Sequence, residues 1–448
     1  MVRFPDGFIW GAATSAYQIE GSPVADGKGP SIWDTFTRIP GTIEDGSSGD
    51  VACDHYRRWE SDIDLMADIG LEAYRFSVSW PRVLPDGIGA VNHPGLDFYD
   101  RLVDGLLDRG IEPFLTLYHW DLPQVLQDRG GWPNRETAFA FAEYAAIVAE
   151  RLGDRVTHWI THNEPWVVAK RGYLYGDKAP GHHDANEAVL ASHHVLLGHG
   201  LAIQAIGGAS PQARIGITLN LTPVVAASTD QKDIEAARRF DGDVNRWYLD
   251  PLHSRGYPDD VLADLEKGGV AIDRAYLESS DDHDIMAGSM DFLGVNYYER
   301  TIVRDASSDV APSVVIPPDA EITDMGWEVY PSGLTELLVQ LNDEYRPRSI
   351  LVTENGCSYG DGPDEDGDVH DRRRISFLKD HIGAVSEAID DGVPVDGYFV
   401  WSLMDNFEWA RGYQQRFGMT WVDFDTQERV LKDSARWYGD VITANGFG

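Results

Sequence analysis

Two glutamates occupy positions from which a carboxylate could take part in catalysis. Glu164 lies in the segment THNEP at 161–165, and Glu354 lies in LVTENG at 351–356. Each follows a β-branched, strand-like run directly and precedes a residue that breaks regular structure. A single glutamate of this kind is explained as well by a structural ion pair. Two together could cleave a glycosidic bond, because one carboxyl protonates the leaving oxygen while the other attacks the anomeric carbon or activates water.

Three further segments carry the groups that a sugar ring would need. A pyranose presents hydroxyls around its edge and an apolar C–H face, so its site requires bidentate polar side chains and an aromatic platform. The segments QIEG at 18–21, HWD at 119–121 and WSLMDNFEW at 401–409 combine these types, and the chain has 14 Trp. Any one tryptophan is more often packing than platform, but Trp401 and Trp409 are interpreted as sugar-contacting.

The elements that must hold these residues alternate along the whole chain. Short apolar runs occur at 8–14, 73–79, 113–119, 156–163, 214–219, 292–297, 350–354 and 397–403, and amphipathic helical patterns occur between them at 56–69, 95–109, 135–152, 185–206, 331–344 and 372–390. Near-continuous apolar strands that alternate with helices indicate a buried parallel sheet. Eight such strands predict an α/β fold, a single (β/α)8 TIM barrel domain over residues 1–448.

The ends of these predicted strands carry the polar and aromatic residues. Glu164 ends the fourth strand, Asn296 the sixth, Glu354 the seventh and Trp401 the eighth. Barrel active sites form at the carboxyl ends of the strands, and strands four and seven lie roughly opposite each other, so their glutamates can flank one bond. We expect the irregular stretch 299–330 to be a loop that frames this site.

Charge is the unusual feature of the composition. The formal net charge is −37, with 51 Asp but only 7 Lys among the 448 residues. Nucleic acid and anionic membrane surfaces would repel such a protein, so neither is expected as a partner. The composition is compatible with an ordinary acidic enzyme, but abundant aspartate with scarce lysine favours adaptation to high salt, where self-repulsion is screened.

Cysteine and histidine usage points away from disulfides and metals. The two cysteines, Cys53 and Cys357, form no disulfide framework, and the histidine pairs at 182–183 and 193–194 lack metal-ligand spacing. We expect no metal and no cofactor. No apolar run approaches the length of a membrane span, and the N-terminal residues lack the pattern of a signal peptide, so a cytoplasmic protein is predicted.

Taken in order, the motifs resemble the family-1 glycoside hydrolases, whose best-known members are β-glucosidases. The resemblance covers essentially the whole chain, and it is carried by FPDGFIWGAATSAYQIEG at 4–21, YRFSVSWPR at 74–82, LYHWDLP at 117–123, THNEP at 161–165, GVNYY at 294–298, MGWEVYP at 325–331, VTENG at 352–356 and the run at 401–409. It implies a retaining β-glycosidase that hydrolyses terminal non-reducing β-D-glucosyl residues, and β-galactosyl or β-fucosyl residues stay open as further substrates.

The resemblance also implies roles for individual residues. Glu164 would be the acid/base and Glu354 the nucleophile, with Arg75, Tyr298 and Asn296 beside them. The positions expected to bind substrate are Gln18, His119, Trp120, Asn163, Trp401, Glu408 and Trp409 for the sugar at the non-reducing end, and Trp327 at the entrance for the aglycone.

Physical reasoning agrees with this division of roles. Arg75 should lower the pKa of Glu354, whereas Glu164, with fewer cationic neighbours, can stay protonated near neutrality. A retaining enzyme places the two carboxyl groups ~5–5.5 Å apart. One departure from the family is His162, where an aromatic or aliphatic residue is usual. Alternation should turn its side chain away from its neighbours, so we interpret it as a hydrogen-bonded structural histidine, with an influence on the pKa of the acid as the alternative.

Substrate class and rival functions are addressed by the same residues. A 6-phosphoglycosidase branch of the family carries Ser and Lys where this chain has Glu408-Trp409. A carboxylate at this position would repel a phosphate group. Unphosphorylated β-glycosides or oligosaccharides are therefore the favoured substrates. Three alternatives remain: an enzyme that mainly transfers glycosyl groups, a non-catalytic sugar-binding barrel, and a metal-dependent barrel hydrolase. The loops 170–186 and 299–330 would decide the aglycone, and a homo-oligomer stays open.

Overall fold

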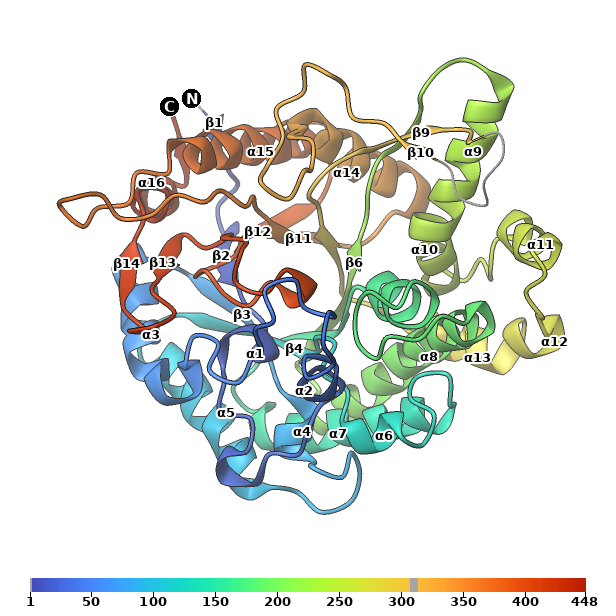
Figure 1. The fold of residues 1–448 in the computed structure, drawn as a ribbon, viewed down its shortest axis with the longest axis horizontal. Helices are drawn as coiled ribbons and strands as arrows, with labels where there is room; N and C mark the ends of the chain where they lie inside the picture. Colours follow the sequence, from blue (N-terminus) through green and yellow to red (C-terminus); the bar gives the residue numbers. More distant parts are fainter. Residues whose placement is uncertain (1, 307–312) are drawn as a thin grey trace.

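The computed structural model describes residues 2–306 and 313–448 and is built around a closed barrel of eight parallel strands (Figure 1). Neighbouring strands follow chain order, and the last pairs with the first. They are β2 (Ile9–Ala13), β3 (Ala73–Ser77), β4 (Glu112–Tyr118), β5 (His158–Asn163), β6 (Arg214–Asn220), β8 (Phe292–Asn296), β11 (Ile350–Asn355) and β12 (Val395–Trp401). The predicted barrel fold and its eight strand positions are confirmed.

Long helices connect the strands and surround the barrel. They are α3 (His55–Ile69), α5 (His93–Leu107), α7 (Glu136–Leu152), α8 (Ala185–Ala209), α14 (Pro331–Tyr345), α15 (Arg372–Asp390) and α16 (Asp433–Ala444). The six helical patterns predicted from the sequence all coincide with members of this set. Between β6 and β8 a series of shorter helices takes the place of one long helix: α9 (Gln231–Asp241), α10 (Trp247–Leu252), α11 (Asp259–Lys267), α12 (Arg274–Leu277) and α13 (Ser280–Met286).

Smaller elements close the two ends of the barrel. Near the termini, which lie side by side in Figure 1, β1 (Val2–Arg3) pairs with β15 (Gly446–Phe447). The remaining elements are the strands β7 (Val224–Ala226), β9 (Thr301–Arg304), β10 (Ser313–Val314), β13 (Thr420–Val422) and β14 (Arg429–Leu431), the short helices α1 (Ala16–Ile19), α2 (Ile32–Phe36), α4 (Trp80–Val83) and α6 (Gln124–Gln127), and the non-α turns η1 (Ala25–Gly27), η2 (Val167–Leu174), η3 (Gly242–Arg246) and η4 (Trp409–Arg411).

One prediction about a loop needs correction. The stretch 299–330 was expected to be irregular, but β9 and β10 lie inside it and form a three-stranded sheet with β7. In β9, more buried and less buried residues alternate over only four residues. A pattern this short cannot be distinguished in the sequence. Residues 307–312 of the stretch lie outside the described part of the chain.

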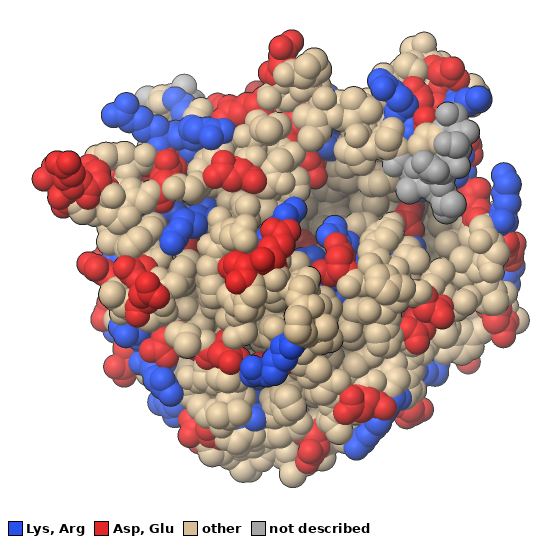
Figure 2. Space-filling model, in the orientation of Figure 1, with Lys and Arg blue, Asp and Glu red and all other residues tan. Residues whose placement is uncertain are grey.

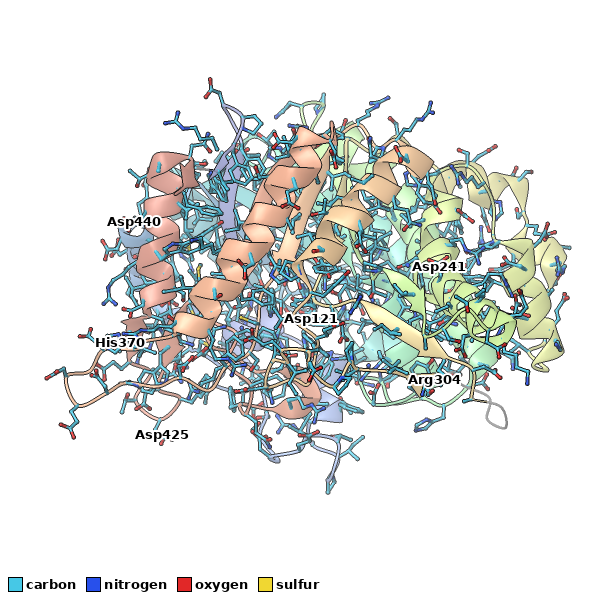
Figure 3. All side chains as sticks on the ribbon, turned by 90° about the horizontal axis from the view of Figure 1, so that it is seen from above. Asp121, Asp241, Arg304, His370, Asp425 and Asp440 are labelled. Atoms are coloured by element: carbon cyan, nitrogen blue, oxygen red, sulfur yellow. The ribbon has the colours of Figure 1, made fainter. Side chains whose placement is uncertain are left out.

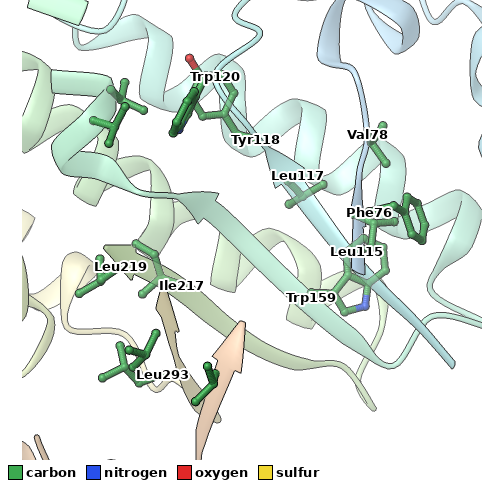
Figure 4. Packing of buried hydrophobic residues seen from close by; sticks show 14 of the residues in the cluster. Phe76, Val78, Leu115, Leu117, Tyr118, Trp120, Trp159, Ile217, Leu219 and Leu293 are labelled. Atoms are coloured by element: carbon green, nitrogen blue, oxygen red, sulfur yellow. The ribbon is translucent and has the colours of Figure 1, made fainter. Parts of the chain in front are cut away.

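The buried apolar residues of the described chain form three clusters, two of which pack on opposite faces of the barrel strands. A large cluster fills the space between the strands and the helices, and Figure 4 shows members such as Leu115, Trp159 and Ile217 on that side of the strands. A smaller cluster takes its residues from the opposite faces. The rings of Phe114 on β4 and Phe399 on β12 lie 4.8 Å apart, although two strands separate β4 from β12 in the barrel. This contact must cross the lumen, so the barrel is a filled core and not a pore.

The two strands that end in glutamates both lose their regular register just before them. The pairing of β5 shifts between Ile160 and Asn163, and that of β11 shifts after Val352. A bulge breaks the strict alternation of side chains and re-aims the residues that follow it. Because of these bulges, Asn163-Glu164 and Thr353-Glu354 each present two consecutive polar residues toward the barrel mouth.

Charged side chains of both signs are scattered over the face that Figure 2 shows, which has a hollow in its surface. In Figure 3, Asp425 and Asp440 lie at the periphery, whereas Asp121 lies in the interior. Arginines join neighbouring helices through several aspartates. Arg151 on α7, for example, contacts Asp97 and Asp100 on α5. Much of the negative charge is therefore at the surface, where salt can screen it.

One helix of the described chain, α8, is long and apolar enough by length and composition to cross a membrane, but it is mostly buried inside the protein. It packs against α7 and η2. The helix α8 is therefore a buried core helix of the barrel wall.

Candidate active site

A cavity of about 410 Å³ opens at the carboxyl ends of the barrel strands. Of the thirteen residues predicted to form the site, eleven line it: His119, Trp120, Asn163, Glu164, Asn296, Tyr298, Trp327, Glu354, Trp401, Glu408 and Trp409. The two glutamates thus share one cavity with the aromatic residues expected to hold a sugar. Its volume is in the range of small-molecule sites.

Glu354 is held by a cation and a phenol. Nη1 of the fully buried Arg75 lies 2.6 Å from Oε1 of Glu354, and the hydroxyl of Tyr298 donates to Oε2 at 2.7 Å. Nη1 of Arg75 also donates to the backbone carbonyl of Thr353. Both carboxylate oxygens are therefore fixed by charge-assisted hydrogen bonds, which orients the group and favours its ionised form.

Glu164 has a different set of partners. Nδ2 of Asn296 donates to Oε1 of Glu164 at 2.7 Å, and no ion pair to Glu164 occurs among the described residues. Asn163 connects the two halves of the site, since its Oδ1 accepts from Nη2 of Arg75 at 2.7 Å and from Nδ2 of Asn296 at 3.1 Å. The arrangement gives one glutamate a cation and the other only a neutral amide.

The pKa values of the two carboxyl groups follow from this difference. Burial, together with the negative charge of Glu354, raises the pKa of Glu164 to about 8. The hydrogen bond from Asn296 acts in the opposite direction but has a smaller effect than the charge of Glu354. Burial also raises the pKa of Glu354, against the opposing effects of Arg75 and Tyr298. Arg75 lowers the pKa of Glu354 in the predicted direction, but desolvation of the buried carboxyl outweighs the cation, so the net shift is upward. Arg75 and Tyr298 thus favour the ionised form of Glu354, an effect that no cation in contact supplies to Glu164 within the described chain.

His119, Trp120 and Asn163 form one hydrogen-bonded wall of the cavity. Nε2 of His119 accepts from Nδ2 of Asn163 at 3.0 Å, and Nε1 of Trp120 donates to the carbonyl of Asn163 at 2.9 Å. Burial and the nearby Arg75 hold the pKa of His119 well below its usual range, so the ring is neutral and carries its proton on Nδ1. That nitrogen is buried and has no hydrogen-bond partner among the described residues.

Aromatic rings surround the same wall. The His119 ring is stacked with Trp401 and Trp409, at centroid separations of 5.8 and 5.9 Å. Trp120, Glu164 and Trp409 have φ angles of 78, 52 and 48°, in the left-handed region that non-glycine residues rarely adopt. Strained backbone of this kind typically clusters at functional sites, where the surrounding structure holds it in place.

Two predicted residues do not line the cavity. Arg75 lies behind Glu354 and acts on it, as expected of a neighbour that orients the nucleophile. Gln18 was expected to bind the sugar, but its Nε2 donates to Oδ1 of Asn406 and the carbonyl of Phe407, while its Oε1 accepts from Ser15. In this arrangement the Gln18 amide supports the 401–409 segment, because its hydrogen-bonding groups already have protein partners.

His162 faces away from the cavity, as alternation predicted. Its ring stacks on Phe141 of α7 at 4.3 Å and lies against Trp132. The expectation that it would be hydrogen-bonded is wrong, because neither ring nitrogen has a partner among the described residues. Burial lowers its pKa well below the usual range, so it serves as a neutral aromatic packing residue in the barrel wall.

The other histidines singled out in the sequence have ordinary partners. His182 contacts Glu187, His193 bonds Tyr257 and Asp282, and His194 bonds Tyr276 and the carbonyl of Trp132. Within residues 2–306 and 313–448, no group of three or more His, Cys, Asp or Glu side chains is arranged to hold a metal ion. Cys53 and Cys357 are both buried free thiols.

The outer part of the cavity contains residues that the sequence analysis missed. Phe417, which was not predicted, forms an aromatic group with the predicted Tyr298 and Trp327, with centroid separations between 5.1 and 6.2 Å. Other lining residues that were not predicted are Trp166, Val167, Arg171, Lys178, Asn220, Leu221, Thr222, Phe240, Val244, Glu299, Thr301, Met325, Ala410 and Arg411. Only the loops 170–186 and 299–330 had been named as parts of this region. Asn220 also ends a barrel strand, a feature that could have identified it.

Comparisons with known proteins agree with this geometry. The model of glycosyl hydrolase family 1 matches residues 1–447. Beta-glucosidase A of Thermotoga maritima is 48% identical over 448 residues, which is 99% of this chain and 98% of that protein. The bifunctional beta-D-glucosidase/beta-D-fucosidase of Bifidobacterium breve is 45% identical and covers 98% of each chain.

Solved structures match equally well. The family 1 β-glucosidase from Thermotoga maritima superposes with a TM-score of 0.96 at 47% identity, over 100% of both chains, and its complex with deoxynojirimycin gives the same values. The chain therefore belongs to glycosyl hydrolase family 1 and is a β-glucosidase-type glycoside hydrolase.

Proposed function

We propose that Glu164 is the acid/base and Glu354 the nucleophile of this enzyme, which cleaves terminal β-D-glucosyl residues by double displacement. The observation that carries the assignment is the unequal pairing of the two carboxyl groups. Glu354 is bound by Arg75 and Tyr298, whereas the only hydrogen-bond partner that the described residues give to the Glu164 carboxyl is the amide of Asn296. An ionised, oriented carboxylate suits attack on the anomeric carbon, and a protonated one suits delivery of a proton to the leaving oxygen.

The same electrostatics support the second step. When Glu354 forms the covalent glycosyl ester, its negative charge disappears. The charge of Glu354 is one of the causes that raise the pKa of Glu164, so its loss lowers that pKa. Glu164 then gives up its proton more readily and can act as the base that activates water. Arg75 and Tyr298 keep their positions and can receive Glu354 again when the ester is hydrolysed.

The test is the Glu354→Ala variant, assayed with 2,4-dinitrophenyl β-D-glucoside with and without sodium azide. We expect hydrolysis to fall by about 10⁴-fold or more, as in other enzymes that lose a nucleophile. Azide should restore turnover and give the α-glycosyl azide, because the small anion enters from the face that Glu354 occupied. Undiminished hydrolysis in this variant would disprove the assignment of Glu354.

Unphosphorylated sugars are the substrates that the cavity favours. The Glu408 carboxylate lines it without a protein hydrogen-bond partner among the described residues, so it can accept from free sugar hydroxyls and would repel a phosphate. We expect glucosides to be cleaved first, and galactosides and fucosides as well. The bifunctional relative from Bifidobacterium breve, and a Thermotoga maritima β-glucosidase structure with galacto-hydroximolactam, support the broader range.

A glycosyl-transferring activity is the second candidate. It shares the covalent intermediate and differs only in whether water or a sugar attacks it. The outer cavity supplies an aromatic surface for an acceptor, formed by Trp327 and Phe417. Product analysis at high substrate concentration measures the share of transfer directly.

Two further properties are proposals of the same kind. An enzyme that works in the cytoplasm is supported by the two buried free thiols, which suit a reducing compartment. Adaptation to high salt is supported by the net charge of −37. Fractionation of the source cells tests the first, and the salt dependence of stability tests the second.

A further inference from the structure

Lys178 differs from the other lysines that the fold encloses. Lys28, Lys170 and Lys432 each have an aspartate oxygen within hydrogen-bond distance of Nζ, at 2.9, 2.5 and 2.9 Å. For Lys178, the described part of the chain offers neither a carboxylate within 4.0 Å nor any hydrogen-bond acceptor for Nζ. An ammonium carries three donors and is costly to desolvate without partners. Its three donors are therefore free to bind a group in the cavity.

The position of Lys178 puts this ammonium inside the active-site cavity. Nζ lies 4.8 Å from the ring centroid of Trp120 and 5.8 Å from that of Trp409, so the two rings offer it cation–π contacts. The following residue, Ala179, is buried, and the backbone N–H of Lys178 donates to the carbonyl of Arg171. The loop is thus anchored on both sides, and the side chain lines the cavity.

Glu408 is the acidic neighbour that most affects Lys178. Burial lowers the pKa of Lys178 to about 8, and the charge of Glu408 is the first influence that opposes this shift. Burial likewise raises the pKa of Glu408 to about 7, and Lys178 is the first influence that opposes it. The two groups are electrostatic neighbours, yet they are farther apart than the 4.0 Å of an ion pair. Neither the carboxylate nor the ammonium has another side-chain partner within the described residues.

We propose that Lys178 and Glu408 hold one hydroxyl of the bound sugar between them, which makes Lys178 a specificity-determining residue. A hydroxyl donates one hydrogen bond and accepts others, so it can donate to the Glu408 carboxylate and accept from the Lys178 ammonium at once. An anionic group would be repelled by Glu408, and a cationic group by Lys178. A neutral hydroxyl is the substituent that satisfies both. The inference rests on the glycosidase function proposed above.

The test measures kcat/KM for 4-nitrophenyl β-D-glucoside and its 2-, 3-, 4- and 6-deoxy analogues, with the wild type and Lys178→Met. A hydrogen bond to a charged group contributes enough that we expect about 10–100-fold lower kcat/KM for wild type when the bridging hydroxyl is removed. In Lys178→Met the penalty for that one analogue should fall by about tenfold relative to wild type, while the penalties for the other analogues stay the same.

Two further variants separate this role from a general effect on the site. Arg171→Met removes another cation that lines the cavity, but Arg171 already pairs with Asp177, so its pattern of deoxy penalties should match wild type. Lys178→Arg keeps the charge and should retain part of the selective penalty. Melting temperatures of all variants show that they are folded.

The outcomes are distinguishable from those of the proposed function. If the wild type does not hydrolyse the parent glucoside, the proposed function fails. If the wild type hydrolyses it and Lys178→Met changes all five substrates by the same factor, the inference about Lys178 is wrong. The inference would also be overturned if Arg171→Met, like Lys178→Met, lost the penalty for the analogue that lacks the bridging hydroxyl.

Discussion

Arg75 and Glu354 form a fully buried ion pair, with Nη1 2.6 Å from Oε1, although 279 positions separate them in the sequence. The pair lies across the barrel mouth, from β3 to β11. Through Nη2, the same guanidinium reaches Oδ1 of Asn163, whose other contact is Nδ2 of Asn296, the partner of Glu164. One arginine thus favours the ionised form of Glu354 and connects it to the amides around Glu164.

Replacing Arg75 by methionine should leave Glu354 buried without its counter-charge. Breaking a buried pair in this way costs about 3–5 kcal/mol of stability. Loss of the cation also raises the pKa of Glu354, so the acidic limb of the kcat/KM profile should move to higher pH. Chemical denaturation and a pH–rate profile measure the two effects. A variant with wild-type stability and an unshifted acidic limb would contradict the role given to Arg75.

Replacing Glu164 by glutamine should affect substrates according to their leaving groups. A general acid contributes about 10²–10⁴-fold, and this contribution matters most when the leaving oxygen is basic. We expect Glu164→Gln to cleave cellobiose more slowly by about that factor, and to form the glycosyl-enzyme from 2,4-dinitrophenyl glucoside at a rate much closer to wild type. Pre-steady-state release of the phenol measures this step. Equal losses on both substrates would argue against acid catalysis by Glu164.

The same variant makes a prediction about stability and pH. The pKa of Glu164 in the folded state is raised to about 8, so folding favours its protonated form. The corresponding stability is fully present below the pKa of the unfolded chain, near 4.3, and is lost as the pH rises through 8. Glutamine cannot ionise. Glu164→Gln should therefore gain about 1–2 kcal/mol over wild type at pH 9, and the difference should shrink at pH 5.

Thermal unfolding at the two pH values checks this sign. Asn296→Ala provides a control in the same network, because it removes a neutral partner of Glu164 and should destabilise the protein at both pH values. A stability difference between Glu164→Gln and wild type that grows toward acid pH would contradict the raised pKa.

Salt should stabilise the protein as a whole. With a net charge of −37, screening relieves repulsion among surface carboxylates, whereas exposed pairs such as Arg151–Asp97 lose only about 0.2–1 kcal/mol each. We expect the melting temperature to be higher in molar NaCl than in dilute buffer at pH 7. The effect should shrink near pH 4.5, where the net charge approaches zero. Equal melting temperatures in dilute and molar salt at pH 7 would remove the idea of salt adaptation.

The positions of the strands and most of the site followed from local patterns. A buried parallel strand is a continuous apolar run, and a barrel collects its functional residues at the ends of such runs, so Glu164, Asn296, Glu354 and Trp401 could be placed from the sequence. The resemblance to a known family then supplied roles for residues such as Arg75, which no periodicity identifies.

Local patterns could not show which hydrogen-bond partners and contacts individual side chains have. Gln18 is predicted to bind the sugar, and local patterns do not show that the fold also brings Asn406 and Phe407 to its amide. His162 was expected to have a hydrogen-bond partner and is instead enclosed by aromatic rings. Both sets of contacts join segments far apart in the chain, which strand and helix periods do not encode.

The barrel and the position of the two glutamates at strand ends could be predicted from the chain alone, because residue type and strand position depend on short stretches of sequence. The different surroundings of the two carboxyl groups come from the fold, since they depend on burial and on Arg75 from another strand. The fold also decided the outer cavity and the place of Lys178 beside Trp120 and Trp409. Desolvation and charge proximity act through space, and only the folded chain brings these groups together.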